Sequence, residues 1–312
     1  MIHIEGLTKY YNDFCAVDNI SLDIRKGEII GLLGPNGAGK TTTLRMLTGY
    51  FQPSSGTIKV NDFSVSDQPL DVKKCIGYLP ESAPLYHNMI VYDYLSYVAD
   101  IWGFSPDGKT ARIRKLSDLC GLDAIMHKII GELSKGLKQR VGIAHAMMSD
   151  PEILILDEPT SGLDPNQIVE IRKIIKEIGK EKTIILSTHI LTEAEATCDR
   201  IIIINKGKIV ADGSTETIKR SEEGGITIHI SLKNSIFEAV ASELKSIKGV
   251  ADVIKNPSEK DDILSITVNC QGEKDLREDV YNKIKIHNWV IYEFYQESRS
   301  LENIFRNLTM EN

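Results

Sequence analysis

The chain has 312 residues, which is enough for one full domain and for a second, smaller one. Its composition of 42% hydrophobic and 26% charged residues is that of an ordinary soluble globular protein. The formal net charge of -7 argues against broad nucleic-acid binding, because such proteins neutralise phosphates with concentrated Lys and Arg.

No apolar run approaches the roughly 20 residues that a membrane-spanning helix needs, so we expect no membrane span. The first residues lack the basic and then apolar pattern of a secretory signal, which favours a cytoplasmic protein. The five cysteines lie far apart and form no Cys-x-x-Cys pair. This spacing favours reduced thiols over a disulfide framework or a zinc site.

Residues 2–24 alternate short apolar pieces with turn residues, which predicts antiparallel strands joined by a loop near Asn12 and Asp13. Tyr10 and Tyr11 lie in this stretch. An aromatic ring shortly before a phosphate-binding loop can stack on a nucleotide base, worth about 1–3 kcal/mol. An ordinary strand tyrosine is an equally good interpretation of either residue.

A glycine-rich stretch follows the apolar run at residues 29–33 and leads into a predicted helix. It matches the pattern G-x-x-x-x-G-K-[ST], in which backbone N–H groups and a helix N-terminus cradle phosphates. Lys40 can reach the β- and γ-phosphates, and Thr41 can offer its hydroxyl to Mg²⁺. The stretch therefore predicts a nucleoside triphosphate site. Its residues are Gly34, Pro35, Asn36, Gly37, Ala38, Gly39, Lys40, Thr41 and Thr42.

The middle of the chain is predicted to be a mainly helical insert over about residues 82–150. Pro80 breaks any regular element and leaves Glu81 on a loop, and apolar residues then recur at helical spacing. Ser134 is a candidate N-cap, and Gly136 permits close approach at the same helix terminus. Taken alone, a capped helix is the simpler interpretation of these two residues.

Four consecutive aliphatic residues, 153–156, predict a buried strand that ends at Asp157 and Glu158. Adjacent acids at a strand end, in a chain with a phosphate loop, can supply a Mg²⁺ ligand and a base for the attacking water. A turn that contains Asp164 precedes a predicted helix at residues 166–179. A further buried strand, residues 183–188, ends at His189.

The composition changes beyond residue 213, and residues 214–225 are predicted to be a linker. Residues 226–312 then show the order βαββαβ and a closing amphipathic helix at residues 300–308, which predicts a small α+β domain of ferredoxin-like fold. No catalytic constellation is visible there. We favour dimer contact or regulation for this accessory domain.

The ordered motifs of residues 1–212 resemble the nucleotide-binding subunit of ATP-binding-cassette (ABC) transporters. The resemblance implies a P-loop NTPase cassette over residues 1–213, with a mixed central sheet, an antiparallel β subdomain and a helical insert. It implies that residues 34–42 are the Walker A loop, that Tyr11 stacks on adenine, and that Asp157 is the Walker B acid. The Leu-Pro-Glu sequence that ends at Glu81 is similar to that of multidrug, antibiotic and gliding-motility-type export cassettes.

Further roles are implied by the same resemblance. Glu158 would be the catalytic base, His189 the γ-phosphate sensor, and Asp164 a residue of the dimer interface. Ser134 and Gly136 would contact the ATP held by the opposite subunit. The family's signature usually reads Leu-Ser-Gly-Gly-Gln, whereas Lys135 and Leu137 stand at two of its positions here. Glu81 replaces the usual glutamine and could bind Mg²⁺ directly or through water.

We therefore expect an ATP hydrolase with ATP and Mg²⁺ as cofactors. It would act as a homodimer or paired cassette with a separate membrane subunit, on the inner face of the cell membrane, and without nucleic acid. An exporter is favoured. A soluble ABC ATPase acting on nucleic acid or the ribosome is a second hypothesis, and a regulatory ATP-binding module with little turnover is a third. Glu158 and His189 weigh against the third.

Overall fold

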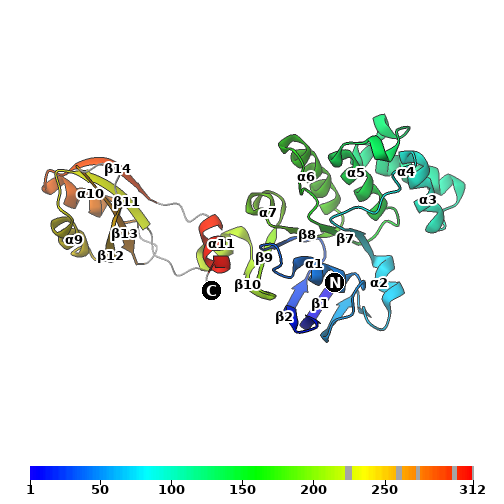
Figure 1. Cartoon of the computed structure of the whole chain (residues 1–312), viewed down its shortest axis with the longest axis horizontal. Helices are drawn as coiled ribbons and strands as arrows, with labels where there is room; N and C mark the ends of the chain where they lie inside the picture. Colours follow the sequence, from blue (N-terminus) through cyan, green and yellow to red (C-terminus); the bar gives the residue numbers. More distant parts are fainter. Residues whose placement is uncertain (222–226, 258–261, 272–274, 297–300, 311–312) are drawn as a thin grey trace. The chain divides into compact units, whose positions relative to one another are not determined.

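A computed structural model of the protein describes residues 1–221, 227–257, 262–271, 275–296 and 301–310, and Figure 1 traces the chain. Contacts divide it into two units. The first comprises Met1–Glu216 together with Phe305–Asn312, and the second comprises Thr217–Ile304. The accessory unit is therefore inserted, in sequence, before the last segment of the first unit.

A six-stranded sheet in the order β10-β9-β3-β8-β7-β6 forms the centre of the first unit. All of its strand pairs are parallel except the β9–β10 hairpin. β3 and β7 are buried at every residue, as continuous aliphatic strands covered on both faces should be. The strands are β3 (Ile29–Leu33), β6 (Ile76–Leu79), β7 (Ile153–Asp157), β8 (Thr183–Thr188), β9 (Arg200–Asn205) and β10 (Lys208–Gly213).

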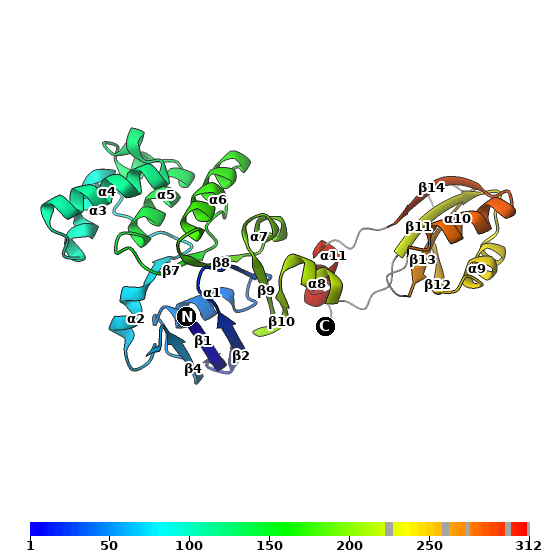
Figure 2. The same ribbon diagram turned by 180° about the vertical axis from the view of Figure 1, so that it is seen from behind.

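An antiparallel sheet in the order β2-β1-β4-β5 covers one face of this core, with helix α1 between the two sheets (Figure 2). The predicted pairing of the N-terminal strands is confirmed, and they turn at Asn12 and Asp13. The elements are β1 (Ile2–Tyr11), β2 (Phe14–Ile24), α1 (Lys40–Leu47), β4 (Ser55–Val60), β5 (Phe63–Ser64) and α2 (Pro69–Cys75).

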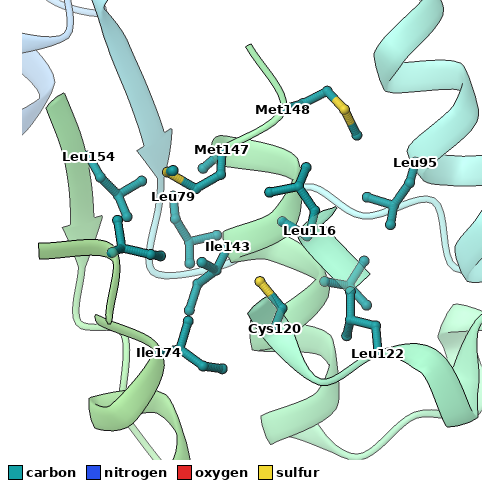
Figure 3. Close-up of a cluster of buried hydrophobic side chains, with 14 of the residues drawn as sticks. Leu79, Leu95, Leu116, Cys120, Leu122, Ile143, Met147, Met148, Leu154 and Ile174 are labelled. Carbon is teal, nitrogen blue, oxygen red and sulfur yellow. The ribbon is translucent and has the colours of Figure 1, made fainter. Parts of the chain in front are cut away.

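Helices cover the other face of the central sheet (Figures 1 and 2). Figure 3 shows how side chains from the sheet, including Leu79 and Leu154, meet Leu116, Ile143 and Ile174 of the helices in one apolar cluster. The helices are α3 (Val91–Ile101), α4 (Pro106–Cys120), α5 (Lys135–Ala146), α6 (Pro165–Gly179) and α7 (Leu191–Thr197), with short 3-10 helices at Asp123–Ile125 and Ile130–Glu132. α2 and α7 were not predicted.

The accessory unit has the predicted ferredoxin-like fold. Its antiparallel sheet has the order β12-β13-β11-β14, and the helices α9 and α10 share its apolar core. Alternate residues of β11, such as Ile228 and Ile230, are fully buried in that core. The elements are β11 (Thr227–Lys233), α9 (Phe237–Lys245), β12 (Val250–Asn256), β13 (Ile263–Cys270), α10 (Arg277–Ile286) and β14 (Val290–Gln296).

Two segments near the accessory unit differ from the sequence prediction. Part of the predicted linker is a helix, α8 (Thr215–Ser221), in which Ile218 is buried; the remainder of that linker, from residue 222, lies outside the described residues. The closing helix is α11 (Leu301–Met310), and its predicted first residue, Ser300, also lies outside them. Phe305–Asn312 group with the first unit rather than with the accessory domain, since Asn205 Nδ2 donates to the carbonyl of Leu308 at 2.9 Å.

The end of α5 is held by a buried arginine from α4. Arg112 Nε donates to the carbonyl of Met148 at 3.0 Å, and its Nη2 donates to that of Met147. The guanidinium also lies 3.3 Å from Asp150. These bonds satisfy the carbonyl of Met148 at the helix C-terminus and give a second donor to that of Met147, which also accepts from the N–H of Asp150. They anchor the helix whose other end carries Ser134.

We expect Arg112→Met to lower the free energy of unfolding by about 1–3 kcal/mol, because the carbonyl of Met148 loses its donor, whereas that of Met147 keeps the N–H of Asp150. Urea unfolding followed by circular dichroism measures this difference. Arg114, which is exposed on the same helix, gives the control: Arg114→Met should change stability by about 0.5 kcal/mol or less. Equal effects of the two substitutions would contradict an anchoring role for Arg112.

Candidate functional site

The glycine-rich loop lies between β3 and α1, in close contact with its surroundings. A Cβ at Gly34 would stand 2.2 Å from the carbonyl oxygen of Ile204. Gly39 has φ 109°, and a Cβ there would lie 2.5 Å from the carbonyl oxygen of Ala16. Only glycine fits these two positions without displacing backbone. The loop is thereby fixed where α1 begins, and a helix N-terminus favours phosphate.

Lys40, the first residue of α1, is buried and is surrounded by acceptors. Its Nζ donates to the carbonyl of Gly34 at 2.7 Å and to that of Pro35 at 3.2 Å. The same ammonium lies 3.4 Å from Oε1 of Glu158, which is also buried. Because burying an unpaired charge is costly, these contacts allow a cation to remain inside the site.

Asp157 ends β7 and offers one carboxylate oxygen to the hydroxyls around it. Its Oδ1 accepts from Thr41 Oγ1 at 3.0 Å and from Ser187 Oγ at 2.6 Å. Its Oδ2 is buried, and no described residue forms a hydrogen bond with it. A carboxylate oxygen with an unused lone pair beside a threonine hydroxyl fits the ligand preferences of Mg²⁺.

Glu158 follows with φ 49°, in the left-handed region, which costs of order 1–3 kcal/mol for a residue with a side chain. Its backbone N donates to Ser187 Oγ at 2.9 Å, and its Oε2 lies 2.9 Å from Nδ1 of His189. The carboxylate is therefore held between Lys40 and His189. Nearby, on β6, burial and the charge of Asp157 raise the pKa of Tyr78 to about 12.

A cleft of about 370 Å³ brings most of the predicted site together. Residues from the tip of the β1–β2 hairpin, the glycine-rich loop, and the loops after β6, β7 and β8 line it. This convergence follows from the fold, since the carboxyl ends of parallel strands meet at one edge of a sheet. The lining residues are Tyr11, Phe14, Ala16, Asn36, Gly37, Ala38, Gly39, Lys40, Thr41, Thr42, Glu81, Glu158, Ser161 and His189.

Glu81 lines the cleft as an exposed side chain, and none of the described residues forms a hydrogen bond or ion pair with it. Its predicted role as a Mg²⁺ ligand therefore stays a prediction. Phe14, Ala16 and Ser161 line the cleft without having been predicted. Ser187, whose hydroxyl forms hydrogen bonds with both Asp157 and Glu158, was also not predicted. A polar residue within a buried aliphatic strand was the signal that could have indicated it.

Ser134, Gly136 and Asp164 are not among the residues that line this cleft. Ser134 caps α5, where its Oγ accepts from the N–H of Leu137 at 3.3 Å, and its side chain is exposed. Asp164 caps α6 in the same way, with Oδ1 accepting from the N–H of Gln167 at 3.0 Å. Gly136 makes room for Gln167, whose Cδ would lie 2.6 Å from a Cβ there. Their predicted roles between subunits are not tested by one chain.

Known proteins match this chain along its length. A family model described as "ABC transporter" matches residues 17–161, and one described as "AAA domain, putative AbiEii toxin, Type IV TA system" matches residues 129–194. The uncharacterized ABC transporter ATP-binding protein YxlF of Bacillus subtilis is 34% identical over 305 residues, covering 98% of each chain. The chain belongs to the ABC transporter family.

A second relative of this ABC cassette is the linearmycin resistance ATP-binding protein LnrL of Bacillus subtilis. It is 33% identical over 312 residues, covering 99% of this chain and 98% of the relative. A solved structure of cbiO1 from Clostridium perfringens, described as part of the ABC transporter complex cbiONQ, is 30% identical. It has a TM-score of 0.66 and covers 71% of this chain and 91% of its own.

Membership in this family makes the protein an ATP-binding cassette and an ATPase. Its fold is the P-loop NTPase fold of such cassettes, as predicted. In the part of the chain that the structure describes, no helix is both long enough and apolar enough to cross a membrane.

Proposed function

We propose that this cassette hydrolyses MgATP at the cleft described above as the energy-coupling subunit of an ABC exporter. The observation that carries the proposal is the buried arrangement of Lys40, Asp157 and Glu158 beside the glycine-rich loop. It combines a phosphate-binding cation, a candidate metal ligand and a base at one edge of the sheet.

Thr41 and Asp157 would hold Mg²⁺, which neutralises negative charge on the phosphates when it is bound. Lys40 and the loop N–H groups would hold the β- and γ-phosphates. Glu158 would accept a proton from the attacking water as its oxygen bonds to the γ-phosphorus and the bond to the β-phosphate oxygen breaks. A γ-phosphate would also compete with Glu158 for contact with Lys40. The Glu158 carboxylate would then be available to accept the proton from water.

His189 has a positioning role in this proposal. Its Nδ1 contacts Glu158 Oε2, while its side chain reaches the cleft. A ring that contacts the base and lines the cleft could respond to a γ-phosphate bound there. This supports the role of γ-phosphate sensor, which the family resemblance implies.

The proposed active form contains two cassettes, as a homodimer or a pair with a related chain. Ser134 is exposed at the N-terminus of α5 but does not line the cleft of its own chain. A helix N-terminus with an exposed hydroxyl is suited to bind phosphate. We propose that Ser134 and Gly136 contact the ATP of the opposite cassette, with Asp164 at the interface between them.

The proposed membrane contact is an aromatic surface on the helical insert. In residues 84–92 of that insert, Leu85 and Val91 are buried in the core, whereas Tyr86 and Tyr92 are 52% and 42% exposed. The rings of Tyr86 and Tyr97 lie 5.7 Å apart, so this aromatic surface extends onto α3. The cassette would then lie on the cytoplasmic face of the membrane, bound to a separate membrane subunit.

Export is supported by the relative that is named for linearmycin resistance, and a membrane partner by the structural neighbour described as part of a transporter complex. A wild type that binds MgATP but releases little phosphate would favour the regulatory module, and copurification with ribosomes or nucleic-acid proteins would favour the soluble ATPase.

Glu158→Gln should bind ATP normally and accumulate as a closed dimer in MgATP, with turnover at least about 100-fold lower, because the base is lost. Gel filtration with light scattering and a phosphate-release assay measure both effects. Lys40→Ala is the control and should neither bind ATP nor dimerise. Hydrolysis by Glu158→Gln at the wild-type rate would disprove the role of the base.

Ser134→Arg should reduce ATP turnover strongly while ATP binding to the monomer stays unchanged, since the residue acts on the other subunit's nucleotide. Ser105 provides a matched control, because it caps α4 through an equivalent bond, from the N–H of Gly108 at 3.4 Å. Ser105→Arg should lose the same helix cap and keep its turnover. If Ser134→Arg weakens monomer binding, the proposed role in trans is wrong.

The full chain, tagged and isolated from gently solubilised membranes, should copurify with a polytopic membrane protein that mass spectrometry identifies. Tyr86→Ser combined with Tyr92→Ser should remove that protein from the preparation. Tyr281→Ser, which alters an exposed tyrosine of the accessory unit, should retain it. Ribosomes or nucleic-acid proteins in place of a membrane protein would favour the soluble alternative.

A further inference from the structure

Phe14 is a second aromatic residue at the nucleotide cleft. It lies directly after the Asn12–Asp13 turn and is paired with Tyr11 across the β1–β2 hairpin. The side chains of directly paired residues project from the same face of a sheet. Tyr11 and Phe14 both line the cleft, and Ala16, two residues further along β2, lines it as well.

Tyr10 and Cys15 form the neighbouring pair of the same hairpin, and neither lines the cleft. This follows from the alternation of side chains along a strand. The hairpin therefore presents one pair of residues to the cleft and the next pair away from it.

Other side chains contact the ring of Tyr11. The ring of Phe51 meets it edge-on, with centroids 6.0 Å apart and planes at 79°. Lys9 Nζ lies 5.6 Å from the centroid of Tyr11 and is fixed by a 2.7 Å hydrogen bond to the carbonyl of Gln52. These contacts hold one side of the Tyr11 ring and leave Tyr11 to line the cleft with a fixed orientation.

Phe14 lacks such support. Its side chain is 64% exposed, and it makes no ring contact within the described part of the chain. A phenylalanine ring has no polar group for water to hydrate, so an occupant of the cleft that covers it gains apolar contact. With Tyr11 and Ala16 beside it, the surface available to that occupant is aromatic and aliphatic. Such a surface suits a flat ring.

We propose that Phe14 is a second ring that binds the base of the nucleotide, as the adaptable partner of Tyr11, the fixed ring to which the family resemblance already assigns base stacking. The inference rests on the proposed function, because the phosphates must first be held by the glycine-rich loop. Stacking recognises the π-face that every base has. Phe14 thus contributes to affinity for a base in general rather than to the choice of adenine.

The test compares the affinities of the purified full chain for MgATP, MgGTP and magnesium tripolyphosphate by isothermal titration calorimetry. Phe14→Ala should weaken ATP and GTP binding by similar factors of about fivefold or more, and leave tripolyphosphate binding unchanged. Phe14→Tyr should bind like the wild type, because it keeps the ring. Tyr10→Ala, which removes the ring on the other face of the hairpin, should have no effect.

Unchanged ATP affinity in Phe14→Ala would overturn the inference, as would an equal loss for tripolyphosphate, which would indicate a displaced phosphate loop. Unchanged ATP binding with reduced turnover would also overturn it and would place Phe14 against a protein partner. A wild type that binds neither ATP nor tripolyphosphate would instead disprove the proposed function. The two failures are therefore distinguishable.

Discussion

A buried ion pair between Lys40 and Glu158 is the interaction on which the arrangement of the cleft depends. Lys40 begins the helix after β3, and Glu158 follows the end of β7; these two strands are not neighbours, because β8 lies between them. β8 supplies Ser187, which pairs in register with Asp157 and bonds to both consecutive acids. A buried charge without a partner is costly, so the register of three parallel strands and the charges of the site constrain one another.

The helical layer imposes a second constraint. The N-termini of α5 and α6 are capped by Ser134 and Asp164, and Gln167 of α6 fills the space that Gly136 leaves on α5. These two helix ends are thus built as one surface. The cleft lies at the edge of the sheet, and the surface formed by these two helix ends is not part of it. The separation of a phosphate-binding cleft from a second, exposed helix terminus is the physical basis for proposing a site completed by another cassette.

Much of this could be predicted from the sequence, because local patterns determine it. The aliphatic run of β7 and the glycines around Lys40 each specify their own element. Residues whose environment depends on distant parts of the chain were harder to predict from the sequence. Ile218 is buried in a segment of linker-like composition, and the position of Phe14 at the cleft depends on residues far from it in the sequence. Composition likewise did not show that Leu85 is buried while Tyr86 is exposed.

The closing helix illustrates the same point with a consequence for the site. The carbonyl of Leu308 accepts a hydrogen bond from Asn205, which begins the turn between β9 and β10. In that turn the N–H of Gly207 donates to the carbonyl of Ala38, and the carbonyl of Gly207 accepts from the N–H of Asp18. α11 therefore supports the turn that backs the phosphate loop. The closing segment of the chain, which follows the accessory unit in sequence, is therefore part of the first unit and of the structure that holds the nucleotide site.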